Sequence, residues 1–214
     1  MNVMKKWLSG FIVLLSLTTV AQSNTDAAKL LEEVINKTTS YSNFKADLDY
    51  TMVNVEMNID EKKSGVIYVQ GDAYRLEMEG QMIICDGHTV WTYLPDSEEV
   101  MVSNVEDSDE SISPTQILSK YSSDYKARFS TDKNCKDENM KAISLKPEEG
   151  NKFEKMTVIV NTKKLSLESF SIYDKNGNIF TYNINSLIPD QVLSDTVFTF
   201  NEKAYPDVEV IDMR

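Results

Sequence analysis

Charged and large apolar side chains alternate strictly along residues 74–79. Because successive side chains of a β-strand point to opposite faces of its sheet, this stretch predicts a strand with one apolar and one wet face. The apolar face would carry Tyr74, Leu76 and Met78. A strand buried on both faces would show a continuous apolar run instead. The same pattern recurs in other segments, which indicates a curved sheet whose inner face holds an apolar ligand.

The period of two predicts a series of short strands separated by turns. One long segment at residues 44–59 changes phase near residues 51–52, which suggests a β-bulge, and a turn is expected at residues 61–65. The close spacing favours an antiparallel meander over a βαβ array. The further predicted strands are residues 66–69, 74–79, 82–85, 89–94, 100–102, 126–129, 140–145, 156–160, 165–173, 179–184 and 197–200, with an edge segment at 205–210.

Two segments are expected to be helical. Residues 25–37 place apolar side chains, including Leu31 and Ile35, on one stripe, with Thr25 as the capping residue. Residues 113–121 begin with a Ser-Pro-x-Gln capping pattern and carry Ile117 and Leu118 on one side. We expect both helices to lie on the sheet face of Tyr74, Leu76, Met78 and Trp91 as a lid. An ordinary closed core, or a helix that plugs a barrel end, would give the same pattern.

The first 21 residues have the features of an export signal. Lys5 and Lys6 precede a mostly apolar stretch, and small residues end at Ala21, where cleavage is expected. A membrane anchor is the alternative, but polar residues interrupt the stretch, which falls short of the roughly 20 apolar residues that a span needs. Residues 22–214 would then form a single domain, expected to be a soluble monomer in the periplasm.

The protein is strongly acidic. Its 34 Asp and Glu outnumber 22 Lys and Arg, for a net charge of −12, and loss of the signal would remove two further lysines. Such a surface repels nucleic acid and anionic membranes. The simplest explanation of the acidic surface is solubility. The alternatives are easier release from lipid head groups and attraction to a basic partner.

The sequence contains no recognisable catalytic or metal-binding constellation. His88 is the only histidine, it follows a turn signal, and no Cys/His/Asp cluster has ligand spacing. Nucleophile and nucleotide-binding motifs are absent, and the carboxylate pairs lie on charged faces. We therefore predict a non-enzyme without cofactor. Cys85 and Cys135 could form a disulfide in an oxidising compartment, or remain two buried thiols, and the sequence leaves both open.

Several segments, taken in order, resemble the LolA family of periplasmic outer-membrane lipoprotein carriers. They are 41–44 after the helix, 65–69, 74–77, the Asp-Gly-x-Thr-x-Trp-x-Tyr stretch within 85–93, and the Phe-Thr-Phe ending that leads from 198 to 212. The resemblance covers almost the whole chain after residue 21. It implies a mainly β fold with α-helices, an unclosed antiparallel β-barrel whose concave apolar face is covered by helices. It also implies that this face holds the acyl chains of lipoproteins loaded by an inner-membrane lipoprotein-releasing complex and delivered to an acceptor at the outer membrane.

The sequence departs from the family pattern at one functional position. An arginine that holds the lid closed in family members is matched here by Gln70, which lacks the charge and fork of a guanidinium. The receiving factor at the outer membrane has a similar barrel but is itself a lipoprotein. This chain has no cysteine at its expected cleavage site to be lipidated, which favours the soluble carrier over the receiving factor. A related stress regulator carries a second domain, for which this chain is too short. A lipid-binding sensor or scaffold with the same barrel is the remaining alternative.

The expected lipid-binding residues come from the alternating strands, the two helices and the ending. They are Tyr74, Leu76, Met78, Trp91, Tyr93, Leu31, Ile35, Ile117, Leu118, Phe198 and Phe200. Trp91 and Tyr93 share one face of their strand, and the sequence does not fix whether that face is the concave one.

Overall fold

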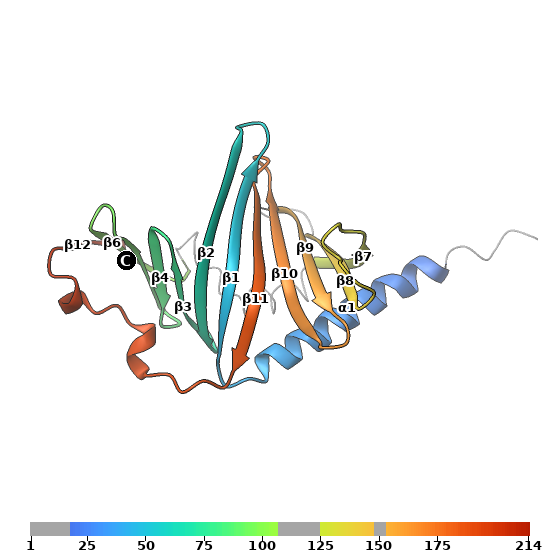
Figure 1. The fold of residues 1–214 in the computed structure, drawn as a ribbon, viewed down its shortest axis with the longest axis horizontal. Coiled ribbons are helices and arrows are strands. Elements are labelled where there is room, and N and C mark those ends of the chain that lie inside the picture. Colours follow the sequence, from blue (N-terminus) through green and yellow to red (C-terminus); the bar gives the residue numbers. More distant parts are fainter. Residues whose placement is uncertain (1–17, 107–124, 148–152) are drawn as a thin grey trace, which may run out of the picture.

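A single curved sheet of twelve strands dominates the part of the chain that the computed structural model describes, residues 18–106, 125–147 and 153–214 (Figure 1). The spatial order is β12-β6-β5-β4-β3-β2-β1-β11-β10-β9-β8-β7. Neighbours pair antiparallel, except that β12 runs parallel to β6. The strands are β1 (Phe44–Asn54), β2 (Ile59–Gln70), β3 (Ala73–Met78), β4 (Gln81–Cys85), β5 (Thr89–Leu94), β6 (Glu99–Asn104), β7 (Tyr125–Ser130), β8 (Met140–Pro147), β9 (Phe153–Asn161), β10 (Ser166–Asp174), β11 (Ile179–Pro189) and β12 (Glu209–Asp212). The predicted unclosed, antiparallel half-barrel is confirmed.

Strand register places the predicted apolar residues on one face. Leu76 pairs with Ile67 on one side and Ile83 on the other, and Ile67 in turn pairs with Ala46. Paired residues point to the same face of a sheet, so these side chains form one apolar row. The neighbouring charged residues, such as Arg75 and Glu77, point to the convex face. The alternation along residues 74–79 therefore marks the two faces of the sheet, as the sequence analysis predicts.

The helix α1 (Thr18–Thr39) covers one half of the concave face (Figure 1). It is longer than the predicted residues 25–37, and it runs through the expected cleavage position near Ala21. Ala27, Leu31, Val34 and Ile35 form its buried stripe. The stripe packs on side chains of β8, β9 and β10, including Ile143, Leu145, Met156, Val158, Val160, Leu167 and Ile172.

The helix α1 does not make the contacts expected of a lid over β3. Its buried stripe packs instead on β8, β9 and β10, in the other half of the sheet. The other expected lid segment, with Ile117 and Leu118, lies outside the described residues. Among the helices that the structure describes, none is both long enough and apolar enough to cross a membrane.

The β1–β2 hairpin is longer than the sequence analysis predicts. The connection lies at residues 55–58, where Asn58 adopts φ 54°, and the predicted turn at residues 61–65 is wrong because these residues belong to β2. The predicted bulge near residues 51–52 is also wrong, since β1 pairs with β2 without a shift and its pairing with β11 shifts between Asp47 and Leu48. The hairpin rises above the rest of the sheet (Figure 1), where neither face needs to be apolar. Val55 and Met57 at its tip are 82% and 67% exposed.

The chain after β11 forms two short 3-10 helices, η1 (Asp195–Phe198) and η2 (Glu202–Ala204), so the predicted strand at residues 197–200 is wrong. Ser194 and Asn201 cap these turns by accepting hydrogen bonds from the N–H groups of Thr196 and Lys203. Such local side-chain bonds compete with strand pairing. Arg75 holds the segment on the convex face, because its guanidinium donates to the carbonyl of Val197 at 3.4 Å.

The two cysteines are free thiols, and the proposed Cys85–Cys135 disulfide is therefore wrong. Cys85 lies in β4, whereas Cys135 lies in the connection between β7 and β8. Six strands separate β4 from β8 in the sheet. Neighbouring strands lie about 4.8 Å apart, so the separation far exceeds the roughly 7 Å limit between the Cα atoms of a disulfide.

Candidate functional site

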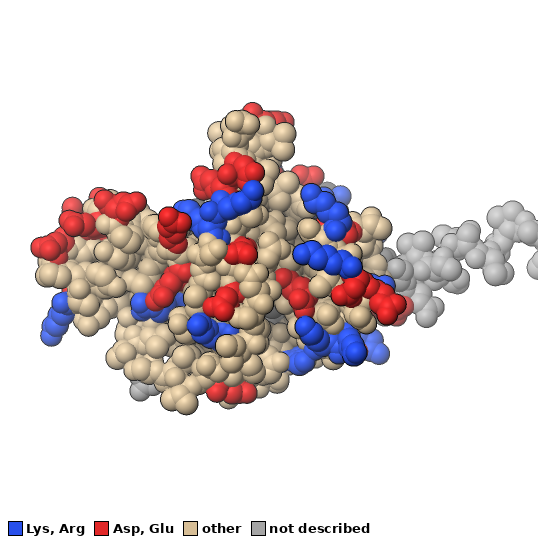
Figure 2. Space-filling view, viewed as in Figure 1, with Lys and Arg blue, Asp and Glu red and all other residues tan. Residues whose placement is uncertain are grey.

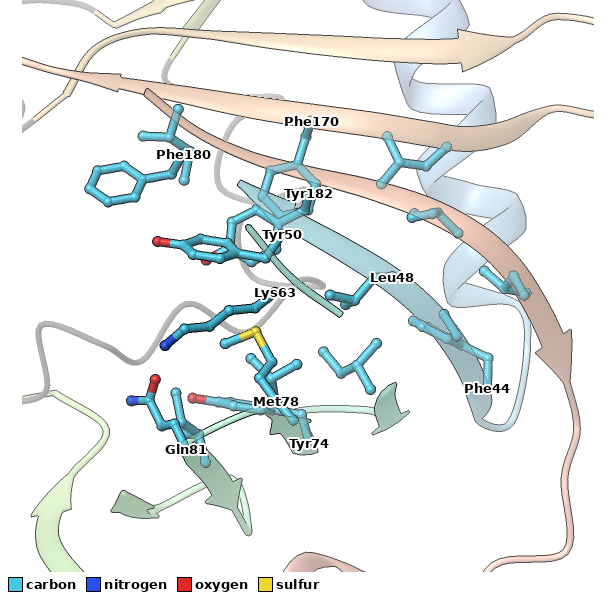
Figure 3. Close-up of a pocket in the computed structure, with 18 of the residues that line it drawn as sticks. Phe44, Leu48, Tyr50, Lys63, Tyr74, Met78, Gln81, Phe170, Phe180 and Tyr182 are labelled. Carbon is cyan, nitrogen blue, oxygen red and sulfur yellow. The ribbon is translucent and has the colours of Figure 1, made fainter. Parts of the chain in front are cut away.

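A cavity of about 510 Å³ lies on the concave face beside α1, over the middle strands of the sheet (Figure 3). Its volume falls within the range of roughly 300–1,000 Å³ that is usual for small-molecule sites. Strands β1–β4, β10 and β11 supply most of the wall, with Thr38 and Phe153 at its edges. The apolar lining residues are Phe44, Ala46, Leu48, Tyr50, Ile67, Tyr74, Leu76, Met78, Ile83, Phe153, Leu167, Phe170, Ile172, Phe180, Tyr182, Ile184 and Leu187.

The cavity wall contains a group of aromatic rings from three adjacent strands (Figure 3). Tyr182 of β11 stacks on Phe170 of β10, with ring centroids 4.6 Å apart and planes at 13°. On its other side it contacts Tyr50 of β1, at 5.1 Å and 54°. Both are favourable ring arrangements. These contacts make this part of the wall a continuous aromatic surface.

Polar side chains are few in the lining. Glu61 and Lys63 of β2 and Gln81 of β4 lie at one end, and the close-up shows the Lys63 ammonium beside Gln81 and Met78 (Figure 3). Burial raises the pKa of the Tyr50 phenol, and the negative charge of Glu61 raises it further. Both effects favour the uncharged form of Tyr50. The cavity therefore presents an apolar interior with a small polar group at one end.

Gly65 leaves room for the side chain of Met78 on the cavity floor. A Cβ atom at this position would lie 2.6 Å from both the Met78 Cγ and the Glu77 carbonyl oxygen. Real Cβ contacts are not this short, so any larger residue would displace β3 or its side chain. The sequence pattern predicts a turn at Gly65 and so gives no sign of this role.

The structure brings Tyr74, Leu76 and Met78 together in the cavity lining. Leu31 and Ile35 lie instead in the core between α1 and the sheet, which borders the cavity through Leu167, Phe170 and Ile172. Ile117 and Leu118 lie outside the described residues.

Trp91 and Tyr93 lie on the convex face, which corrects their expected place in the lining. Trp91 pairs with Ile84 and Tyr93 pairs with Met82, and these partners lie opposite Arg75 and Glu77 of β3. The physical reason is that β4 is buried on both faces, because the segment after β11 covers its convex side.

Phe198 and Phe200 belong to this convex cover as well. Phe198 is buried in η1, on the side of the sheet where Arg75 holds Val197. Phe200 stacks on Tyr205 at 5.1 Å and 12°, and both rings contact Tyr93. Tyr93, Phe200 and Tyr205 therefore form an aromatic cluster on the convex face, and neither Phe198 nor Phe200 lines the concave cavity.

Gln70 ends β2 and is exposed, with Ala73 as its pairing partner. Its neighbour Val69 points to the concave face, so Gln70 projects from the opposite face. The position of the family arginine is thus not directed into the cavity of this protein.

The aromatic residues of β10 and β11 are the main part of the site that the sequence analysis missed. Phe180, Tyr182 and Ile184 alternate with polar residues, which is the same signal that identified β3. What the sequence lacked was the pairing of β1 with β11, which brings Tyr182 beside Tyr50. In the described parts of the chain, no group of three His, Cys, Asp or Glu side chains could hold a metal ion.

An open sheet with a preformed apolar cavity defines a class of proteins that bind apolar ligands. The family described as outer membrane lipoprotein carrier protein LolA matches residues 39–201, and the chain therefore belongs to this family. No curated protein matches the chain in sequence.

Two solved structures share the fold at low sequence identity, and a third is similar at a lower TM-score. An uncharacterised conserved protein from Thermus thermophilus is 12% identical, with a TM-score of 0.58 over 87% of this chain and 99% of that one. A DUF1329 family protein from Desulfovibrio piger is 13% identical, with a TM-score of 0.50 over 86% and 99%. A putative outer membrane lipoprotein-sorting protein domain from Vibrio parahaemolyticus is 12% identical, with a TM-score of 0.49 over 85% and 99%.

Proposed function

We propose that this protein carries lipoproteins through the periplasm by holding their acyl chains in the concave cavity. The observation that supports the proposal most strongly is the cavity of about 510 Å³ whose lining is mainly aliphatic and aromatic. Membership of the LolA family gives the same direction. No chemical step is required, because binding and release are sufficient for transport.

The physical need for such a host follows from the hydrophobic effect. Each buried CH₂ group of an acyl chain gains about 0.8 kcal/mol, so a long chain strongly resists leaving a membrane for water. A carrier must offer a comparable apolar surface. The wall formed by Leu48, Leu76, Met78, Phe170 and Tyr182 offers it on four different strands.

The proposed cellular path is export, loading and delivery. Residues 1–21 would act as the signal and be removed near Ala21. An inner-membrane lipoprotein-releasing complex would load the monomeric carrier, and an acceptor at the outer membrane would receive the cargo. Residues 113–121 remain our candidate for a lid that moves between these steps, and Gln70 cannot supply the charge of the family arginine in closing it.

Release of lipoproteins from inner-membrane vesicles tests the proposal. The purified protein should release them, and Leu76→Glu should not, because a carboxylate would be stranded on an apolar wall. Ile188→Glu is the matched control. Ile188 is 46% exposed, is on the convex face and pairs with Lys45, so the same substitution there should be tolerated.

Circular dichroism of both variants establishes that they fold. If the folded Leu76→Glu variant released lipoproteins as well as the unaltered protein, the cavity assignment would be wrong. If the unaltered protein released none, and co-purified instead with free lipid or a signalling protein, the carrier role would give way to a lipid-binding sensor.

A further inference from the structure

Strands β10 and β11 separate at one end of the sheet. They pair only from Ser169 with Asn183 to Tyr173 with Ile179. Beyond this point β11 continues beside β1 as far as Pro189, and β10 continues beside β9 with a register shift after Leu167. The two strands therefore diverge, and the C-terminal end of α1 lies next to the gap.

A second cavity of about 450 Å³ occupies this gap. It shares four lining residues with the apolar cavity, namely Thr38, Leu167, Ile184 and Leu187. The two cavities are thus neighbours that meet at the end of α1. An elongated ligand could occupy both.

The second cavity is rich in ammonium groups, although the protein as a whole carries a net charge of −12. Lys37 of α1 and Lys163 and Lys164 of the β9–β10 turn line it, against one carboxylate, Glu168. Glu168 accepts a hydrogen bond from the Ser166 hydroxyl at 2.7 Å. Lys and Arg side chains gather at the lower right of the space-filling view, over the turn between β9 and β10 (Figure 2).

The turn that presents the lysines is fixed by hydrogen bonds. The buried Asn161 side chain accepts from the backbone N–H groups of Lys163 and Lys164, at 3.1 and 2.9 Å. Leu165 follows with φ 49°. The Lys37 ammonium donates to the carbonyl of Lys164, which links α1 to this turn. The backbone that carries Lys163 and Lys164 is therefore fixed, and the Lys37 ammonium is joined to it from α1.

We propose that this lysine-lined cavity binds the anionic head group, phosphate or carboxylate, of an amphiphile whose acyl chain occupies the apolar cavity. The proposal rests on the proposed function in one respect, namely that the apolar cavity accepts acyl chains. It adds a ligand class that an acylated protein terminus alone does not explain. Ammonium groups form strong, charge-assisted hydrogen bonds with phosphate and carboxylate oxygens.

The test compares two ligands that differ only by a phosphate group. 1-Palmitoyl-lysophosphatidic acid and monopalmitoylglycerol share chain and glycerol, and only the first carries a phosphate. In titration calorimetry below their critical micelle concentrations, we expect the phosphate-bearing ligand to bind roughly tenfold more tightly at low salt. The preference should shrink as ionic strength rises.

The variant Lys163→Gln/Lys164→Gln should lose this preference and keep its affinity for monopalmitoylglycerol. The matched control is Lys133→Gln/Lys136→Gln, which removes two exposed charges from the β7–β8 connection and should keep the preference. Inorganic phosphate at the same concentration should not bind measurably, because it lacks the chain.

Each outcome separates the two proposals. If neither lipid binds the unaltered protein, the acyl-chain function fails. If both bind equally, or the control variant loses the preference as well, the head-group site is wrong and the cavity function stands. Binding of inorganic phosphate alone with the affinity of the phospholipid would make this a free-anion site and would also overturn the proposal.

Discussion

The ring of Tyr50 in β1 contacts the ring of Tyr182 in β11, with centroids 5.1 Å apart. The contact exists because β11 returns to the middle of the sheet and pairs antiparallel with β1. This pairing joins the two halves of the sheet, β2 to β6 with β12 on one side and β7 to β10 on the other. The wall of the cavity is consequently built from strands that lie far apart in the sequence, β1–β4 and β9–β11.

Ionisation of Tyr50 should weaken the fold at high pH. Burial, and secondarily the charge of Glu61, raises its pKa above the ordinary 10.0. A raised pKa means that the neutral phenol is favoured in the folded protein. The contribution of the neutral Tyr50 phenol to the free energy of unfolding is fully present below about pH 10, and it is lost as pH rises through the higher pKa of the folded protein.

Chemical denaturation of the unaltered protein and of Tyr50→Phe, at about pH 9 and about pH 11, measures this effect. We expect the free energy of unfolding to fall more steeply with pH in the unaltered protein. Equal slopes for the two proteins would show that Tyr50 has an unshifted pKa.

Alanine substitutions of Leu31 and Leu76 should distinguish a residue of the closed core from a residue that lines the cavity. Leu31 is 2% exposed in the core under α1, so Leu31→Ala should lower the free energy of unfolding by about 2–5 kcal/mol. Leu76 borders the open cavity and is only half-buried, so Leu76→Ala should cost about 1 kcal/mol. Urea denaturation followed by circular dichroism gives both values. Equal losses would indicate that Leu76 belongs to a closed core.

The alternation of side chains in the sequence was sufficient to predict most strands, because a half-buried strand must alternate. It failed where burial is not one-sided. The β1–β2 hairpin extends beyond the sheet, so its apolar residues follow no face and the turn was placed too late. The segment at residues 197–200 looks like a strand by composition, but Ser194 caps a short helix that includes residues 197 and 198, and Asn201 caps the next one.

The face of Trp91 was unpredictable for a related reason. Its position relative to Leu76 depends on β4, and residues 82–85 are apolar without alternation. Both faces of β4 are buried, so the sequence carries no signal that links the face of β3 to that of β5. Only the register Arg75–Ile84–Trp91 shows that Trp91 is on the convex side.

The convex aromatic cluster should affect stability and leave binding unchanged. Phe200→Ala removes the stacking on Tyr205 and the contact with Tyr93, and should lower the free energy of unfolding by about 1–3 kcal/mol. Acyl-chain binding by the folded variant should equal that of the unaltered protein. A selective loss of binding at unchanged stability would return Phe200 to the cavity wall.

Both cysteines should react with a thiol reagent, and they should do so at different rates. Burial raises the pKa of both, and Cys85 is almost fully buried whereas Cys135 is half-buried. Because the thiolate is the reactive form, Cys135 should react first in the native protein and Cys85 only slowly. A chromogenic disulfide reagent should count two thiols after denaturation without reductant. A count of zero would restore the disulfide.

Site-specific photo-crosslinking detects which face of the sheet touches the cargo. A photoreactive phenylalanine analogue replaces Met78 on the concave face or, as control, Ile188 on the convex face. We predict that, in living cells, position 78 crosslinks to acylated lipoproteins and position 188 does not. Crosslinks to lipoproteins from position 188, with none from position 78 in a folded protein, would contradict this prediction.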